Sequence, residues 1–141
     1  MQASELEKAL SLALKAHQGQ KDKSGQPYIL HPVRVMLQFQ EAEARIVALL
    51  HDVLEDSDIS IDELQQAGFG TKIIEAVRCL TRKPNEEYLD YIRRIKENPL
   101  ARKVKLADLK DNLDVNRLEE LQAKDCRRLE RYLQAKKILS W

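Results

Sequence analysis

Hydrophobic residues recur every three or four positions along most of the chain, and this spacing indicates helices with one buried face. Alternation of apolar and polar residues, which would indicate strands, is not sustained in any segment. Residues that break helices interrupt the pattern, as at Gly19, Gly68 and Pro99. The pattern predicts an all-α protein, a single-domain helical bundle over residues 1–141. The predicted helices cover residues 4–19, 32–39, 46–56, 60–68, 71–80, 88–95, 98–112, 114–123 and 124–139.

One stretch, residues 48–56 (ALLHDVLED), differs from an ordinary amphipathic helix because ionisable groups crowd into an apolar segment. At about 100° per residue, a helix would place His51, Asp52, Glu55 and Asp56 on one face. The opposite face would carry an apolar stripe made of Ile46, Val47, Leu50 and Leu54. Carboxylates this close together repel one another, and a bound divalent cation would relieve that repulsion. The alternative for this stretch taken alone is a solvated helix end with acidic residues.

Composition narrows the class of protein. The chain has 141 residues, 43% hydrophobic and 33% charged, which is enough for one core. Its net charge of +1 argues against a nucleic-acid polymer as partner. Cys79 and Cys126 form no CxxC pattern and indicate a reducing compartment. Because the N-terminus has no charged leader and no segment approaches transmembrane length, we expect a cytoplasmic protein with no membrane partner.

Two further polar residues lie in partly apolar segments elsewhere in the chain. His31 directly precedes a proline at a predicted helix start, and Asp108 ends residues 104–108 (VKLAD). Asn112 follows Asp108 by four residues and would share its helix face. Taken singly, His31 is typical of a cap or surface position, and Asp108 of an ion pair with Lys105 or Lys110.

Taken together with the first stretch, these residues suggest a metal centre. Two imidazoles and two carboxylates from three segments could surround one octahedral ion and leave positions for water and substrate. This mixed nitrogen and oxygen set suits Mn, Fe, Co or Zn better than Mg alone. The candidate ligands are His31, His51, Asp52 and Asp108.

The order of these ligands resembles the H…HD…D pattern of metal-dependent HD-domain phosphohydrolases. Within that superfamily the chain resembles the hydrolase domain of the RelA/SpoT alarmone enzymes, and particularly the small stand-alone alarmone hydrolases. The matching segments extend over nearly the whole chain and lie in the family's order. They are residues 16–20 (AHQGQ), 25–32 (GQPYILHP), 48–56 (ALLHDVLED) and 104–108 (VKLAD) with Asn112.

The resemblance implies an HD-domain fold and a role for each candidate residue. The implied reaction is that of a guanosine-3′,5′-bis(diphosphate) 3′-pyrophosphohydrolase, which releases pyrophosphate from the ribose 3′ position of ppGpp. The implied cofactor is one divalent metal ion, usually manganese. The resemblance assigns the metal to His31, His51, Asp52 and Asp108, the attacking water to Glu55 and Asp56, and a nucleotide contact to Asn112.

The loop before Gly25 departs from the family pattern, which has an Arg-Lys pair that holds the base and the phosphates. Here the Arg position holds Gln20 or Asp22, neither of which stacks on a base as a guanidinium does. Lys21 or Lys23 could still supply positive charge for phosphates.

This departure keeps two alternatives to the alarmone hydrolase open. One is an HD phosphohydrolase that acts on another nucleotide, such as an adenosine alarmone. The other is a nucleotide-sensing module without turnover, against which the presence of Glu55 and Asp56 counts.

Overall fold

The computed structural model describes residues 3–141, and every regular element in that part of the chain is a helix, as predicted. Met1 and Gln2 lie outside the described residues, and they are the start of the segment in which we expect no charged leader. No helix within residues 3–141 is long and apolar enough to cross a membrane. The helices are α1 (Glu5–Ala16), α2 (Leu30–Met36), α3 (Ala42–Leu50), α4 (Val53–Asp56), α5 (Ile61–Gln66), α6 (Thr71–Cys79), α7 (Tyr88–Lys96), α8 (Pro99–Asn112) and α9 (Ala123–Ser140).

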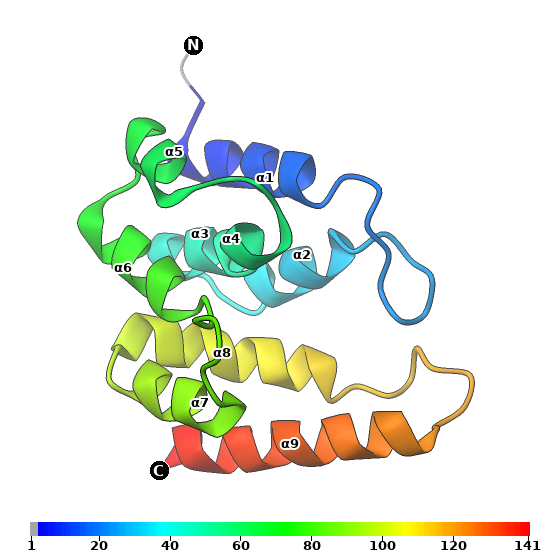
Figure 1. Cartoon of the computed structure of the whole chain (residues 1–141). Helices are drawn as coiled ribbons and strands as arrows, with labels where there is room; N and C mark the ends of the chain where they lie inside the picture. The colour runs from blue at the N-terminus through cyan, green and yellow to red at the C-terminus, as the bar shows by residue number, and fades with distance from the viewer. Residues whose placement is uncertain (1–2) are drawn as a thin grey trace.

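Helices α3 and α8 form the centre of the bundle (Figure 1). Helix α3 packs against α1, α2, α6 and α8, while α8 also packs against α7 and α9. In Figure 1 α1 lies at the top and α9 at the bottom, so that the two halves of the chain meet between α3 and α8. Val47 and Leu50 of α3 and Leu109 of α8 are completely buried there. The core therefore fixes α2, α3 and α8 against one another.

The sequence encodes two helix starts directly. The Ser4 hydroxyl accepts a hydrogen bond from the Glu7 amide at 3.2 Å, and the Glu7 carboxylate accepts one from the Ser4 amide at 3.1 Å. Asn98 caps α8 by accepting from the Ala101 amide at 3.0 Å, and Pro99 occupies the first helical position. Both starts agree with the prediction.

The prediction of one continuous helix over residues 46–56 is wrong, because α3 ends at Leu50 and α4 begins at Val53. His51 Nδ1 lies 2.5 Å from the Ala48 carbonyl oxygen. In a continuous helix that carbonyl would accept from the Asp52 amide instead. The break also changes which residue faces the core: Val53 is fully buried, whereas Leu54 is only partly buried.

The prediction of two final helices is also wrong. Residues 114–122 form an irregular loop, and a single helix, α9, follows. The Asp114 carboxylate accepts from the Asn116 amide at 3.0 Å, which favours a turn over a helix. Helix α9 then begins at Ala123, and the backbone amide of Gln122 directly before it donates to the Asp125 carboxylate at 3.0 Å. This loop forms one wall of the candidate site.

Candidate metal centre and adjoining pocket

Three of the four predicted ligands come together where α2, α3 and α8 meet. His31 belongs to α2, His51 follows the last residue of α3, and Asp108 belongs to α8. One ligand atom of each lies within 4.8 Å of the other two, and all three side chains are buried. Segments far apart in the sequence therefore supply a buried group of two imidazoles and a carboxylate, which is positioned to bind a divalent metal ion.

Each imidazole is oriented with its Nε2 atom toward the centre of this group. His31 Nδ1 lies 2.6 Å from Asp111 Oδ2, while its Nε2 lies 2.8 Å from Asp108 Oδ1. His51 Nδ1 faces the Ala48 carbonyl, and its buried Nε2 has no hydrogen-bond partner among residues 3–141. It lies 3.4 Å from Asp108 Oδ1, without the geometry of a hydrogen bond. A buried nitrogen without a partner, directed at a carboxylate, fits a ligand for a cation.

The electrostatics of the group also favour a cation. Burial opposes the charged form of His51, but the carboxylates of Asp52 and Asp108 outweigh burial and raise its pKa well above the usual range. Burial likewise opposes the charged form of His31, and its contacts with Asp108 and Asp111 raise its pKa. Both rings therefore attract protons in the absence of another positive charge. A metal ion would take the place of those protons, because ligand imidazoles must be neutral.

The fourth predicted ligand, Asp52, lies beside this group rather than within it. Its Oδ2 atom is 3.0 Å from His51 Nε2 and accepts a hydrogen bond from the Tyr28 hydroxyl. Burial raises the pKa of Tyr28, and the charge of Asp52 raises it further, so the hydroxyl remains a donor. Tyr28 thus holds one oxygen of Asp52 next to the cluster.

Asp108 carries the ion pair that the sequence offered as the alternative to metal binding. Lys105 Nζ lies 2.8 Å from Asp108 Oδ2, and the Asn112 amide donates to Oδ1 at 3.0 Å. Burial works against ionisation of Asp108, but the charges of Lys105 and His51 lower its pKa well below the usual range. Asp108 can form the ion pair and still bind a metal ion, because Lys105 contacts one carboxylate oxygen while the other faces His31 and His51.

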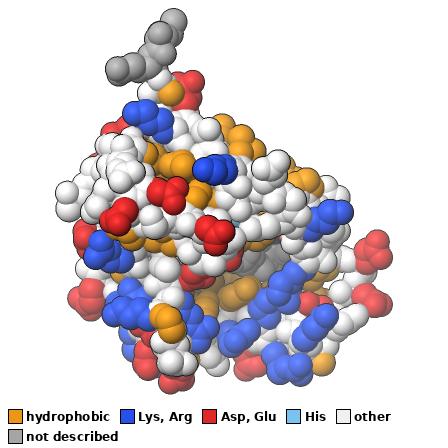
Figure 2. Space-filling view, turned by 45° about the horizontal axis from the view of Figure 1, so that its top comes forward, with side chains coloured by type: hydrophobic (Ala, Val, Ile, Leu, Met, Phe, Trp, Pro, Cys, Tyr) orange, Lys and Arg blue, Asp and Glu red, His pale blue; other side chains and the backbone are white. Residues whose placement is uncertain are grey.

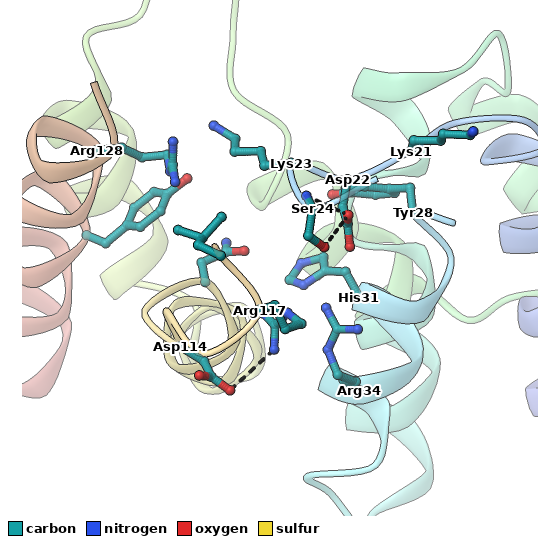
Figure 3. Close-up of a pocket in the computed structure, with 13 residues that line it drawn as sticks. Lys21, Asp22, Lys23, Ser24, Tyr28, His31, Arg34, Asp114, Arg117 and Arg128 are labelled. Atoms are coloured by element: carbon teal, nitrogen blue, oxygen red, sulfur yellow. Dashed lines mark hydrogen bonds and ion pairs between the residues drawn. The ribbon is translucent and has the colours of Figure 1, made fainter. Parts of the chain in front are cut away.

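A pocket of about 280 Å³ adjoins the cluster, and His31 lines it. Figure 2 shows a hollow in the surface with Lys and Arg side chains gathered below it and acidic side chains above it. The close-up in Figure 3 shows His31, Arg34 and Arg117 near one another, with Arg128 on the opposite side of the pocket. The lining residues are Lys21, Asp22, Lys23, Ser24, Tyr28, His31, Arg34, Asn112, Asp114, Arg117, Leu118, Arg128 and Tyr132. Basic side chains outnumber acidic ones in this lining, so the pocket suits an anionic ligand.

The predicted substrate contacts Lys21, Lys23 and Asn112 all line this pocket. In Figure 3 the Lys21 side chain points away from His31, whereas Lys23 extends toward the side of Arg128. Gln20 is not among the lining residues, since its amide donates to the carbonyls of Ala16 at 3.1 Å and Asp56 at 2.8 Å. Of the two residues that could take the family's Arg position, Asp22 is therefore the one that lines the pocket.

The predicted catalytic carboxylates Glu55 and Asp56 lie on α4, directly after the cluster, and both are exposed. Glu55 accepts a hydrogen bond from the Arg82 amide. Although both residues are accessible to solvent, neighbouring atoms partly desolvate their carboxyl groups, and this desolvation together with the charge of Asp52 raises the pKa of both. Neither residue lines the basic pocket, and Asp56 borders a different hollow beside Ser57.

Sequence reasoning missed several residues that the fold brings to the site. Asp111 is three residues after Asp108, and Arg34 is three residues after His31, so shared helix faces could have indicated both. Arg117 and Arg128 reach the pocket through the loop and α9, for which the sequence offers no local signal. Tyr132 has a spacing typical of core residues and does pack against the core, but it also lines the pocket.

Comparison with known proteins agrees with this arrangement. A family described as an HD domain matches residues 9–129. A guanosine-3′,5′-bis(diphosphate) 3′-pyrophosphohydrolase of Aquifex aeolicus is 35% identical over 123 residues, which cover 79% of this chain and 18% of that protein. The bifunctional (p)ppGpp synthase/hydrolase SpoT of Escherichia coli is 36% identical over 93 residues, which cover 63% of this chain and 13% of that protein. The chain thus spans less than a fifth of these curated relatives.

A solved structure has the same fold. It is a metazoan ortholog of SpoT, described as hydrolysing ppGpp and playing a role in starvation responses. The two structures superpose with a TM-score of 0.78 at 25% sequence identity, over 99% of this chain and 87% of the other. The likeness therefore extends across the helices that carry the buried cluster.

Proposed function

The chain belongs to the HD-domain family, and from that premise we propose that it is a metal-dependent 3′-pyrophosphohydrolase acting on guanosine 3′,5′-bis(diphosphate). The observation that carries the proposal is the position of His31, which belongs to the buried cluster and also lines the basic pocket. A phosphorylated ligand in that pocket would bring a phosphoryl group next to the candidate metal ligands. The names of the relatives and the description of the solved ortholog support this choice of substrate.

We propose that one divalent ion is held by His31, His51, Asp52 and Asp108, with Mn²⁺ as the preferred metal. The mixture of imidazole and carboxylate donors supports this choice. Asp52 is included because its carboxylate lies 3.0 Å from His51 Nε2 and is held there by Tyr28. The chemistry that a divalent ion supplies when bound is polarisation of a phosphoryl oxygen and acidification of water.

In this proposal Glu55 or Asp56 accepts the proton of the attacking water. A general base works best when its pKa lies near the pH at which the enzyme operates. The raised pKa values of both carboxylates, caused by burial and by Asp52, move them in that direction. Pyrophosphate leaves from the ribose 3′ oxygen, and guanosine 5′-diphosphate is the second product.

We propose that Lys21, Lys23 and Asn112 contact the substrate. Partial burial and the positive charge of Arg128 lower the pKa of Lys23. An anion between these two side chains would relieve their repulsion. Asn112 lines the pocket while its amide donates to Asp108, so it connects the substrate position with a candidate metal ligand.

Asp22 at the pocket wall favours a second candidate function, hydrolysis of an adenosine alarmone or another nucleotide phosphate. Three hydrogen bonds, from the amides of Ser24 and Gln26 and from the Ser24 hydroxyl, hold the Asp22 carboxylate in place. A carboxylate cannot stack on a purine as an arginine does, so guanine has no built-in advantage at this position.

A turnover screen distinguishes these functions. Purified protein with Mn²⁺ is incubated with guanosine 3′,5′-bis(diphosphate), its adenosine counterpart and simple nucleoside mono- and diphosphates, and the products are separated by ion-exchange chromatography. We expect pyrophosphate and guanosine 5′-diphosphate, and no turnover by the His51→Ala variant, which controls for contaminating phosphatases. Turnover of another nucleotide alone would favour the second candidate, and binding without turnover would indicate a sensing module.

We also propose the cytoplasm as the location of this reaction. Cys79 and Cys126 are free thiols in the structure, which fits a reducing compartment. The nucleotide substrate is the proposed partner, and the absence of nucleic-acid and membrane partners stays a prediction.

A further inference from the structure

Asp111 lies on α8 between the buried cluster and the basic pocket. Its carboxylate contacts His31 of the cluster and Arg34 of the pocket lining. Its Oδ2 atom is 2.6 Å from His31 Nδ1 and accepts from Arg34 Nη2 at 3.0 Å. Its Oδ1 atom accepts from Arg34 Nε at 2.8 Å. Arg117 donates to the Asp111 backbone carbonyl at 2.9 Å and lies 3.6 Å from Oδ2. One carboxylate therefore separates an imidazole from two guanidinium groups.

The two arginines reach into the pocket, whereas Asp111 lies behind them. Arg34 and Arg117 line the pocket and Asp111 does not, and its side chain is only 8% exposed. Figure 3 shows Arg34 below His31 and Arg117 beside both of them. Because it is buried, Asp111 is directed at His31 and at its two arginines rather than at a ligand in the pocket.

The two candidate imidazole ligands are held by different means. A backbone carbonyl, that of Ala48, faces His51 Nδ1, and no side-chain substitution removes it. His31 instead depends on a side chain, which itself depends on Arg34. Ligand histidines commonly donate their second ring N–H to a carboxylate, which fixes the tautomer and the orientation of the ring.

We propose that Asp111 is a positioning residue for the metal centre: it holds His31 with Nε2 toward the metal and neutralises Arg34 and Arg117, which would otherwise repel the cation. This inference rests on the metal site of the proposed function. Without the carboxylate, His31 loses its anchor, Arg34 loses its ion pair, and Arg117 keeps only its ion pair with Asp114.

Metal affinity, measured without any nucleotide, tests this role. Mn²⁺ is titrated into metal-free protein, and the free ion is followed by electron paramagnetic resonance. We expect Asp111→Asn to weaken Mn²⁺ binding by about 10- to 100-fold, the usual effect of removing the carboxylate behind a ligand histidine. Asp90→Asn is the matched control, because it removes one negative charge from an exposed ion pair with Arg93 and changes no residue of the cluster or of the pocket lining. Its Mn²⁺ affinity should stay near that of the wild type.

A second variant and a spectroscopic signal separate positioning from general destabilisation. Arg34→Lys keeps the positive charge and the Asp111 carboxylate but removes the paired hydrogen bonds that hold this carboxylate, and we expect an affinity loss of about tenfold. If Asp111→Asn does not fold, the Mn²⁺ affinity of the Arg34 variant tests the proposal without it. In Zn²⁺-loaded protein, ¹⁵N spectra should show His31 protonated at Nδ1 and metal-bound at Nε2, with the Nδ1 proton moving upfield in Asp111→Asn.

Folded variants that bind Mn²⁺ as tightly as the wild type, or an unchanged His31 signal, would overturn the inference while leaving the proposed function intact. A wild-type protein that binds Mn²⁺ but hydrolyses no nucleotide would remove the proposed function and leave the role of Asp111 standing. A wild-type protein that binds no Mn²⁺ would overturn both.

Discussion

Glu55 and Asp56 test the chemistry separately from metal binding, because both are exposed and neither belongs to the three-residue cluster. If they handle the attacking water, Glu55→Gln and Asp56→Asn should keep the fold and the metal. The double variant should lose roughly 10²- to 10⁴-fold in kcat, the range for loss of a general acid or base. Steady-state kinetics with metal analysis of the same samples measures this.

Asp58→Asn is the control for this prediction, since Asp58 is another exposed acid two residues beyond Asp56. Its kcat should match the wild type. Near-normal turnover of the metal-loaded double variant would remove the catalytic assignment and leave a mechanism without a protein base.

Asp22 leads to a prediction about base selectivity. The structure resolves which residue stands at the pocket wall, because Gln20 is engaged with Ala16 and Asp56 while Asp22 lines the pocket. With no guanidinium there to stack on the base, we expect similar kcat/KM values for guanosine and adenosine 3′-pyrophosphates. A several-hundredfold preference for guanine, more than roughly 3 kcal/mol in transition-state free energy, would contradict this prediction.

At the scale of elements, local signals predicted helix starts well and tertiary effects poorly. Ser4 and Asn98 cap helices because their side chains satisfy nearby amides, which is a property of a few adjacent residues. At the break after Leu50, the His51 ring faces the Ala48 carbonyl, and Tyr28 from a distant loop donates to Asp52. Spacing alone extended the helix through that break, so it predicted His51 and Asp56 on one helix, whereas Asp56 lies on α4.

The cap of α8 should matter for stability, because this helix carries Asp108, Asp111 and Asn112 at its other end. Asn98→Ala removes the acceptor for the Ala101 amide and should lower the free energy of unfolding by about 0.5–2 kcal/mol. Asn98→Asp retains a good cap and should stay near the wild type. Urea denaturation of both variants measures the difference. Equal destabilisation of the two would show that the cap is not the cause.

At the scale of the whole molecule, the site exists only because α8 packs against both α2 and α3. The sequence identified His31, His51 and Asp108 from their chemistry and order, but their separation of less than 4.8 Å depends on that packing. The contacts of Asp111 and of the basic residues that line the pocket depend on the same packing. The residue types were therefore predictable, whereas the contacts among them required the fold.

If this cluster holds the metal that hydrolysis requires, activity should return when metal is restored to stripped protein. Protein stripped with a chelator is titrated with Mn²⁺ while bound metal and pyrophosphate release from guanosine 3′,5′-bis(diphosphate) are measured together. We predict no activity without metal, activity proportional to bound Mn²⁺ up to about one ion per chain, and neither binding nor turnover in folded His51→Ala and Asp108→Ala. Full activity in the metal-free protein, or stoichiometric metal in both variants, would contradict the account.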